Sequence, residues 1–85
     1  MKTMLEQQIE KDLLRKLLHH KIIGAKHTSI DNLPKSFPKH LRGTVKDTAK
    51  NLLRKGFLRL KPTSYGLEVS INPDKLEEIN RMIFG

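Results

Sequence analysis

Side chains that could hold a metal ion or attack a substrate are sparse in this 85-residue sequence. Cysteine is absent, which excludes zinc ribbons, iron–sulfur clusters, disulfide scaffolds and thiol nucleophiles. Histidine occurs four times, and His19 and His20 are neighbours. Adjacent residues on a helix point about 100° apart, so this pair cannot easily share one tetrahedral ion. His27 and His40 stand in other segments without an obvious carboxylate partner, and we expect no metal site.

Nothing in the sequence predicts catalysis. The pair Gly43-Thr44 lacks the lysine and serine of a phosphate-binding glycine-rich loop. No two carboxylates stand in a context that distinguishes them as an acid and a base. We therefore expect a protein that is not an enzyme and that carries no cofactor.

Basic side chains are abundant, and they are concentrated in the middle of the chain. Residues 26–61 have a net charge of +8, against +2 for residues 1–25 and −2 for residues 62–85. A concentrated block creates a field with a direction, which attracts a polyanion such as nucleic acid. A merely solvated face is the competing interpretation. We expect the block to form one exposed ridge from its ten cations: Lys26, Lys35, Lys39, Arg42, Lys46, Lys50, Arg54, Lys55, Arg59 and Lys61.

The length of the chain predicts one domain over residues 1–85, because typical domains have about 100–150 residues. An apolar content of 36% suits one small core but no deep ligand cavity. No apolar run approaches the ~20 residues that span a bilayer, and no signal peptide is evident. We expect a cytoplasmic protein with no membrane partner.

The first third of the chain predicts one long helix and one short helix. Apolar residues recur every three or four positions over residues 4–21, with Thr3 as N-cap and Gly24 as the stop. The expected apolar stripe comprises Leu5, Ile9, Leu13, Leu14, Leu17 and Leu18. Glu10 is expected on the opposite, polar side. The stripe suits either core packing or a dimer seam. Residues 25–28 suit a short strand, and a short helix over about residues 29–34 follows, capped by Thr28 or Ser29 and limited by Pro34.

A second strong helix is predicted over about residues 39–55. Pro38 suits its first position, and Gly56 suits a left-handed C-cap. Its apolar stripe contains Leu41, Val45, Ala49, Leu52 and Leu53. On a helical projection the opposite face contains Lys39, His40, Gly43, Asp47, Lys50, Asn51 and Arg54, flanked by Thr44 and Lys46.

Alternating apolar residues then predict an antiparallel hairpin over residues 57–71. Its strands cover residues 57–61 and 67–71, joined by the turn-rich segment 62–66. Leu58, Leu60, Leu67, Val69 and Ile71 are expected on the core side. A last helix over residues 73–84 follows, with Asn72 as its N-cap and Pro73 at its first position.

This order of elements resembles a winged helix-turn-helix domain, and the likeness covers most of the chain. The stretch GTVKDTAKNLLRKGFLRL at residues 43–60 is similar to the third helix and first wing strand of many prokaryotic transcription regulators. The stretch KPTSYGLEVSINP at residues 61–73 resembles the wing of small stand-alone archaeal winged-helix proteins. The resemblance implies an α+β fold with an N-terminal helix, a recognition helix over residues 39–55, a wing over residues 57–71 and a C-terminal helix. The second helix, near Pro34, is less regular than in the family.

The resemblance also implies the residues that would contact duplex DNA. Recognition helices of this kind enter the major groove, and the wing contacts the backbone or the minor groove. The helix residues implied are Lys39, His40, Arg42, Gly43, Thr44, Lys46, Asp47, Lys50 and Arg54, and the wing residues are Arg59, Lys61, Thr63, Ser64 and Tyr65. Arg42 would bond to guanine, whereas Lys50, Arg54 and Lys55 would meet phosphates. For Asp47 a bond within the helix to Lys46, Lys50 or Asn51 is favoured over a base contact, and for Tyr65 packing at the strand end is the alternative.

The favoured function is therefore that of a duplex-DNA-binding transcription regulator or chromosome-associated (nucleoid) factor. An RNA- or ribosome-associated protein and a protein-interaction module remain as alternatives. Roughly five to seven phosphate contacts would give a slope of log K against log salt near −4.5 to −6. Because one monomer offers a small footprint, a homodimer through the N- and C-terminal helices would favour specific binding.

Overall fold

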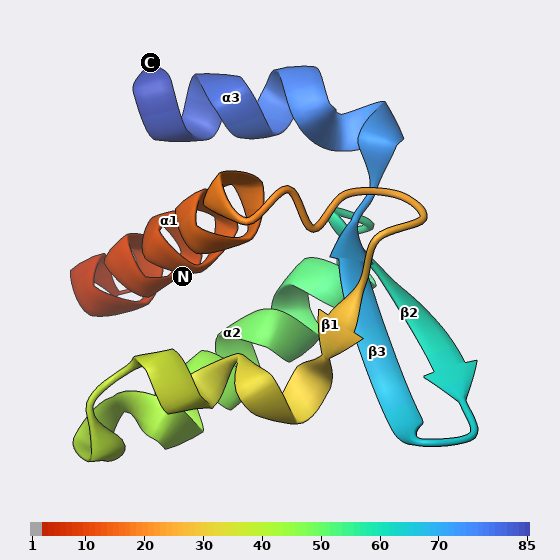
Figure 1. Ribbon diagram of the computed structural model, residues 1–85. Helices are drawn as coiled ribbons and strands as arrows, with labels where there is room; N and C mark the ends of the chain where they lie inside the picture. The colour runs from red at the N-terminus through yellow and green to blue at the C-terminus, as the bar shows by residue number, and fades with distance from the viewer. Residues whose placement is uncertain (1–2) are drawn as a thin grey trace.

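Three α-helices and one small sheet make up the α+β fold of the computed structural model, which describes residues 3–85 (Figure 1). In chain order the helices and strands are α1 (Met4–His19), β1 (Thr28–Ser29), α2 (Arg42–Arg54), β2 (Leu58–Thr63), β3 (Gly66–Ile71) and α3 (Leu76–Phe84). Single 3₁₀ turns cover Ile30–Asn32, Pro34–Ser36, Lys39–Leu41 and Pro73–Lys75. None of the helices in residues 3–85 has both the length and the apolar character needed to cross a bilayer.

The sheet is antiparallel with the strand order β1-β3-β2, a layout compatible with the winged-helix arrangement expected from the sequence. The predicted hairpin is confirmed, but its strands are longer than predicted. They continue to Thr63 and Gly66, so only Ser64 and Tyr65 form the turn, and the expected five-residue link is wrong. The Thr63 hydroxyl donates to the carbonyl of Gly66 and accepts from the amide of Tyr65, which closes the turn tightly. Pro62 is tolerated because β2 is an edge strand.

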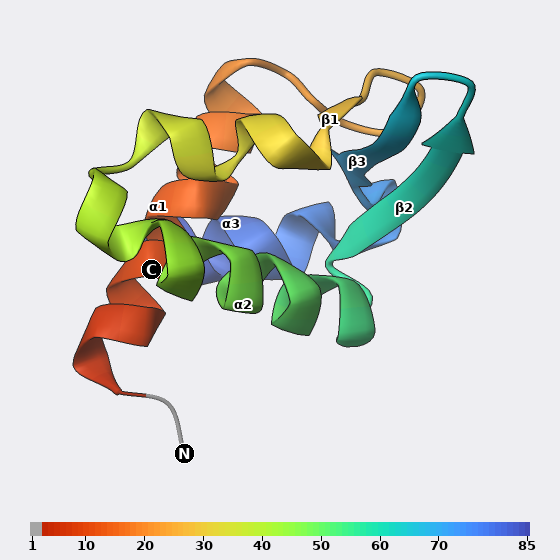
Figure 2. The same ribbon diagram turned by 90° about the horizontal axis from the view of Figure 1, so that it is seen from below.

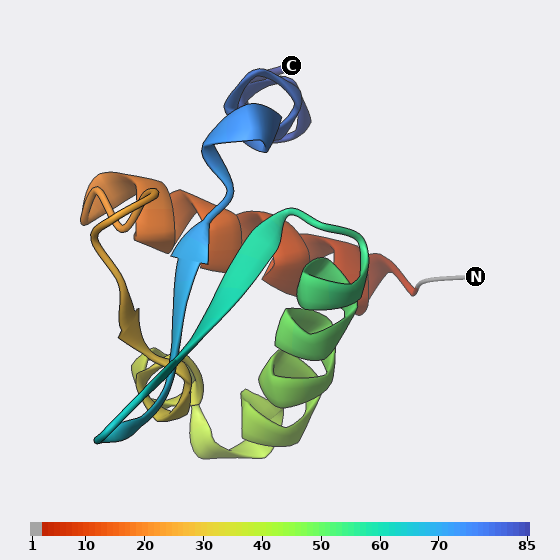
Figure 3. The same cartoon turned by 90° about the vertical axis from the view of Figure 1, so that its right-hand side faces the viewer.

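One core joins all the helices to the sheet. α1 lies between α3 and α2, and the sheet closes one end of this stack (Figures 1 and 3). The buried side chains are Ile9, Leu13, Leu14, Leu17, Leu33, Phe37, Val45, Ala49, Leu52, Leu58, Val69, Ile71 and Ile79. Most of the predicted stripe positions are therefore confirmed as core.

Four side chains differ in burial from the sequence expectation. Leu5, Leu60 and Leu67 are about half exposed, at 51%, 45% and 46%. Leu5 lies in the first turns of α1, while Leu60 and Leu67 face inward on the half of the hairpin that extends past the core. Glu10, predicted on the polar side of α1, is buried at 7% exposure, and Lys55 Nζ lies 4.0 Å from its carboxylate.

The end of α1 differs from the prediction that the helix runs to Lys21 and stops at Gly24. Thr3 is the N-cap as predicted, accepting from the amide of Glu6. The helix ends at His19, because Lys21 adopts a left-handed conformation with φ of 57°. The amides of Lys21 and Ile22 then donate to the carbonyls of Leu18 and Leu17, the Schellman pattern. Gly24 is also left-handed, but its amide donates to Ile71 in the sheet.

The segment between α1 and α2 contains 3₁₀ turns instead of the predicted short helix at 29–34. Ser29 is the cap, as predicted, and accepts from the amide of Asp31. Pro34 starts a second turn, because its ring cannot continue the first. The short strand lies at residues 28–29, so it begins three residues after the predicted start and shares only Thr28 with the predicted range 25–28.

The remaining helix boundaries shift by a single turn. The helix predicted from Lys39 begins at Arg42, since Pro38 precedes a 3₁₀ turn over residues 39–41. The helix predicted from Pro73 begins at Leu76 for the same reason, after a turn that Asn72 caps as predicted. In both places a proline opens a tighter turn that leads into the α-helix.

The left-handed Lys21 predicts a stabilising substitution. An L-residue in this conformation costs about 1–2 kcal/mol, whereas glycine adopts it freely but loses more entropy on folding. We expect Lys21→Gly to raise the free energy of unfolding in urea by about 0.5–1 kcal/mol. Lys21→Ala is the matched control, because it removes the same side chain and keeps the strain. An equal or lower stability of the glycine variant would contradict the assignment.

Candidate nucleic-acid interface

The orientation of α2 is set by its buried stripe. Val45, Ala49 and Leu52 are at most 2% exposed, and Thr48 is 5% exposed. The opposite stripe faces solvent, as the helical projection predicted, and its exposed members are Gly43, Lys46, Asp47, Lys50 and Arg54. In Figure 2 this helix crosses the front of the molecule. A row of basic side chains is thereby presented on one side.

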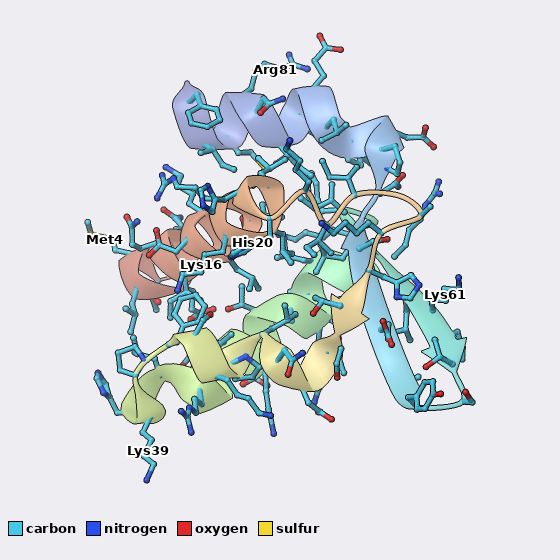
Figure 4. All side chains as sticks on the ribbon, in the orientation of Figure 1. Met4, Lys16, His20, Lys39, Lys61 and Arg81 are labelled. Carbon is cyan, nitrogen blue, oxygen red and sulfur yellow. The ribbon has the colours of Figure 1, made fainter. Side chains whose placement is uncertain are left out.

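The two ends of α2 lead into a 3₁₀ turn and into the hairpin. Before the helix, Lys39 and His40 are exposed on a 3₁₀ turn, and Lys39 projects away from the body of the protein (Figure 4). After it, Gly56 adopts a left-handed conformation with φ of 84°, as predicted. Its carbonyl accepts from Asn72 Nδ2 at 2.9 Å, which ties the end of α2 to the end of β3. This hydrogen bond helps to fix the position of the helix relative to the hairpin.

The hairpin tip lies on the same side of the molecule as the start of α2, and α3 lies on the opposite side (Figures 1 and 3). Tyr65 is 95% exposed, so the alternative that it packs at the strand end is wrong. Ser64 is exposed beside it, and Thr63 is half-buried because its hydroxyl closes the turn. Lys61 is exposed further back on β2 (Figure 4).

Four cations form what we call the basic face: Lys39, Lys46, Lys50 and Arg54. In residues 3–85 none of the four forms an ion pair, although Arg54 Nη1 donates to Asn51 Oδ1 at 3.3 Å. Lys61 on the hairpin has no ion pair within these residues either. Unpaired exposed ammonium and guanidinium groups are the groups that polyanions recognise.

The ten cations of the central block do not all converge on one ridge, contrary to the sequence expectation. Lys55 lies 4.0 Å from the Glu10 carboxylate on α1, and Arg59 Nη2 lies 3.2 Å from Asp74 Oδ2 before α3. These acids draw the two cations away from α2. Lys26 lies on the loop before β1. The sequence could not show this, because the acids that pair with Lys55 and Arg59 are distant along the chain.

Arg42 is the least projecting cation of this region. It is half-buried, and its Nε atom is enclosed without a hydrogen-bond partner in the described residues. Thr44 is half-buried as well, so both predicted contacts lie at the edge of the exposed stripe. Gly43 lies at its centre, and no atom would lie within 4 Å of a Cβ added there, so the backbone is open to solvent.

Two expectations about side-chain partners are wrong. Asp47 makes no bond to Lys46, Lys50 or Asn51, and no other hydrogen bond or ion pair within the described chain. His27 does have a carboxylate partner, since its Nδ1 contacts Glu68 on β3. That pair joins residues 41 positions apart, a contact that depends on the register of β1 on β3.

A hollow adjoins the basic face, and its lining shows what chemistry this surface offers. The hollow, of about 230 Å³, lies between α2 and the 3₁₀ turns, and its polar lining consists of Lys46, Lys50 and Asp31, beside the apolar Ile30, Leu33, Pro34 and Ala49. No group of three histidine, aspartate or glutamate side chains within residues 3–85 is arranged to hold a metal ion. The chemistry this surface offers is therefore the binding of anionic groups.

Comparison with known proteins does not assign this surface. No protein-family model matches the chain, and no curated protein or solved structure matches it.

The exposure of Tyr65 can be tested by fluorescence, because the chain has one tyrosine and no tryptophan. We expect acrylamide to quench the native protein nearly as efficiently as it quenches the urea-unfolded chain, since the ring is 95% exposed. The unfolded chain serves as the internal reference. Strong protection of the native tyrosine would show that the hairpin tip packs against the protein.

Proposed function

We propose that the protein binds duplex DNA as a winged helix-turn-helix domain. In this proposal α2 enters the major groove, and the β2–β3 hairpin acts as a wing against the backbone or the minor groove. The observation that carries it is the basic face, whose four cations lack ion pairs in residues 3–85. The hairpin tip lies on the same side of the molecule as the start of α2 (Figures 1 and 3).

The dimensions of α2 support this mode of binding. Thirteen residues make a helix of about 20 Å, and a major groove about 12 Å wide admits one helix. Gly43 carries no side chain at the centre of the exposed stripe, so the backbone can approach the DNA closely there. His40 and Lys46 border Gly43 and would reach base edges, whereas Lys39, Lys50 and Arg54 would neutralise phosphates.

The distribution of acids supports the same orientation. Asp47 is the single acid between residues 33 and 63, a segment that holds nine cations. Asp74, Glu77 and Glu78 lie at the start of α3, on the far side of α1 from α2. The protein thus has a positive side and a more negative side, and such a field orients a charged partner during its approach.

Duplex DNA is favoured over single-stranded RNA by the lack of aromatic platforms. Readers of single strands stack successive bases on several exposed rings, whereas the proposed interface offers only Tyr65 on the hairpin and His40 before α2 in the described chain. A protein-interaction module would not need the four cations of the basic face, which form no ion pairs in the described residues. Regulation of transcription, or association with the nucleoid in the cytoplasm, is the role we propose for this domain.

We extend the proposal to a homodimer through the terminal helices. Met4 and Leu5 at the start of α1 and Phe84 at the end of α3 are 87%, 51% and 72% exposed. Two copies would double the small footprint of one domain on DNA. Sedimentation velocity with and without duplex DNA tests this extension, and a monomer in both states would contradict it without affecting DNA binding itself.

Neutralising two cations of the basic face should weaken DNA binding. In a fluorescence titration with duplex DNA, Lys46→Gln with Lys50→Gln should lower the affinity by about tenfold or more. The slope of log K against log salt should become less steep by about 0.9, because Lys50 is the phosphate contact of this pair.

The matched control for this pair is Lys11→Gln with Arg81→Gln, which removes the same total charge from exposed sites on α1 and α3. It should leave the slope unchanged. Equal losses in the two double variants would mean that only net charge attracts DNA. A structured RNA that competes for the wild-type protein more strongly than duplex DNA would reject the choice of ligand.

Removing the one acid of this face should have the opposite effect. Asp47 is exposed and unpaired within the described residues, so it repels phosphates without holding the helix together. We expect Asp47→Asn to raise the affinity for duplex DNA about two- to fivefold at low salt, an effect that screening reduces at high salt. Glu77→Gln on α3 is the control and should have no effect. A loss of affinity in Asp47→Asn would instead indicate that this carboxylate accepts from a base.

A further inference from the structure

A separate cavity of about 210 Å³ lies between α1 and the 3₁₀ turns. Its floor is apolar and is formed by Leu13, Leu17 and Leu33, which are 1%, 4% and 6% exposed. Its rim is polar and includes Lys16, His20, Asn32 and Ser36. A concave apolar floor with a few polar groups at its edge is the usual construction of a small-molecule site.

Lys16 supplies the charge of this rim, and its ammonium group is fixed in position. Its Nζ donates to the carbonyl of Ser36 at 2.9 Å and lies 4.4 Å above the centre of the Phe37 ring. In Figure 4, Lys16 and His20 lie on the side of α1 that faces the 3₁₀ turns. Lys16 has no ion pair in residues 3–85, so a half-buried cation is held here without a counter-anion.

From these features we infer that the cavity binds a small apolar carboxylic acid. The carboxylate would pair with Lys16 Nζ, and the hydrocarbon part would lie on Leu13, Leu17 and Leu33. A neutral ligand would leave the ammonium group without a counter-anion, and an inorganic anion would leave the leucine floor in contact with water. Only a molecule with both parts satisfies the floor and the rim together.

The size of the cavity limits the ligand to one ring or a short chain. Benzoate and hexanoate are therefore suitable probes. Ligands of this size bind with a Kd on the order of 1 mM when the binding free energy per non-hydrogen atom is that of an ordinary small ligand. Because the test contains no nucleic acid, its outcome is independent of the proposed DNA binding.

The experiment is an NMR titration of the full chain, labelled at the leucine methyl groups, with benzoate and with neutral benzamide. We expect benzoate to shift the methyl signals of Leu13, Leu17 and Leu33 in a saturable way, and benzamide to bind at least fivefold more weakly. Sulfate at the same ionic strength should not reproduce the shifts. Equal binding of benzoate and benzamide, or equal shifts with sulfate, would overturn the proposal.

Variants test whether the carboxylate of the ligand pairs with Lys16. Lys16→Gln should weaken benzoate binding at least fivefold and leave benzamide unchanged, whereas Lys16→Arg should keep benzoate binding within about threefold of wild type. Lys11→Gln is the control on the same helix, because Lys11 does not line this cavity. Asn32→Phe, which covers the mouth and leaves Lys16 in place, should abolish binding of both probes and remains informative if Lys16→Gln does not fold. Unchanged benzoate binding in both Lys16→Gln and Asn32→Phe would overturn the proposal.

Discussion

The burial of one stripe of α2 is the constraint on which the rest of the structure depends. Val45, Ala49 and Leu52 are apolar and almost fully enclosed by α1 and the sheet, so the helix has one rotation about its axis that satisfies the core. That rotation turns the basic face outward. The chain turns into the hairpin at the left-handed Gly56, and the hairpin tip lies on the same side of the molecule as the start of α2 (Figures 1 and 3).

The distribution of charged side chains over the surface depends on this arrangement, and the net charge alone does not describe it. Acids are placed where they compensate particular cations: Glu10 beside Lys55, and Asp74 beside Arg59. The Arg59–Asp74 pair is exposed and contributes little to stability, whereas the Glu10 carboxylate beside Lys55 is buried, and both acids direct a long basic side chain. The cations of the basic face have no such partner within residues 3–85, and the same holds for cations on other elements, such as Lys11 and Lys16 on α1. What distinguishes the basic face is therefore the clustering of its cations on one stripe of α2 and the turn before it.

Sequence periodicity predicted the elements well and their ends less well. Gly56 was placed correctly because glycine is the preferred left-handed residue after a helix, whereas Lys21 in the same role carries no such signal. Alternation along the hairpin predicted which residues share a face, but not that the sheet extends past the core and exposes Leu60 and Leu67. The roles of Lys55, Arg59 and His27 depend on partners far along the chain, so only the tertiary structure identifies them.

The central claim is most directly tested by a backbone-amide NMR titration of the labelled protein with a short duplex DNA at low salt. We expect shifts to follow residues 39–54 and the hairpin tip at residues 63–66, with the Gly43 amide among the largest, while the α3 amides stay in place. Shifts confined to α3, or no shifts at all at low salt, would contradict the account.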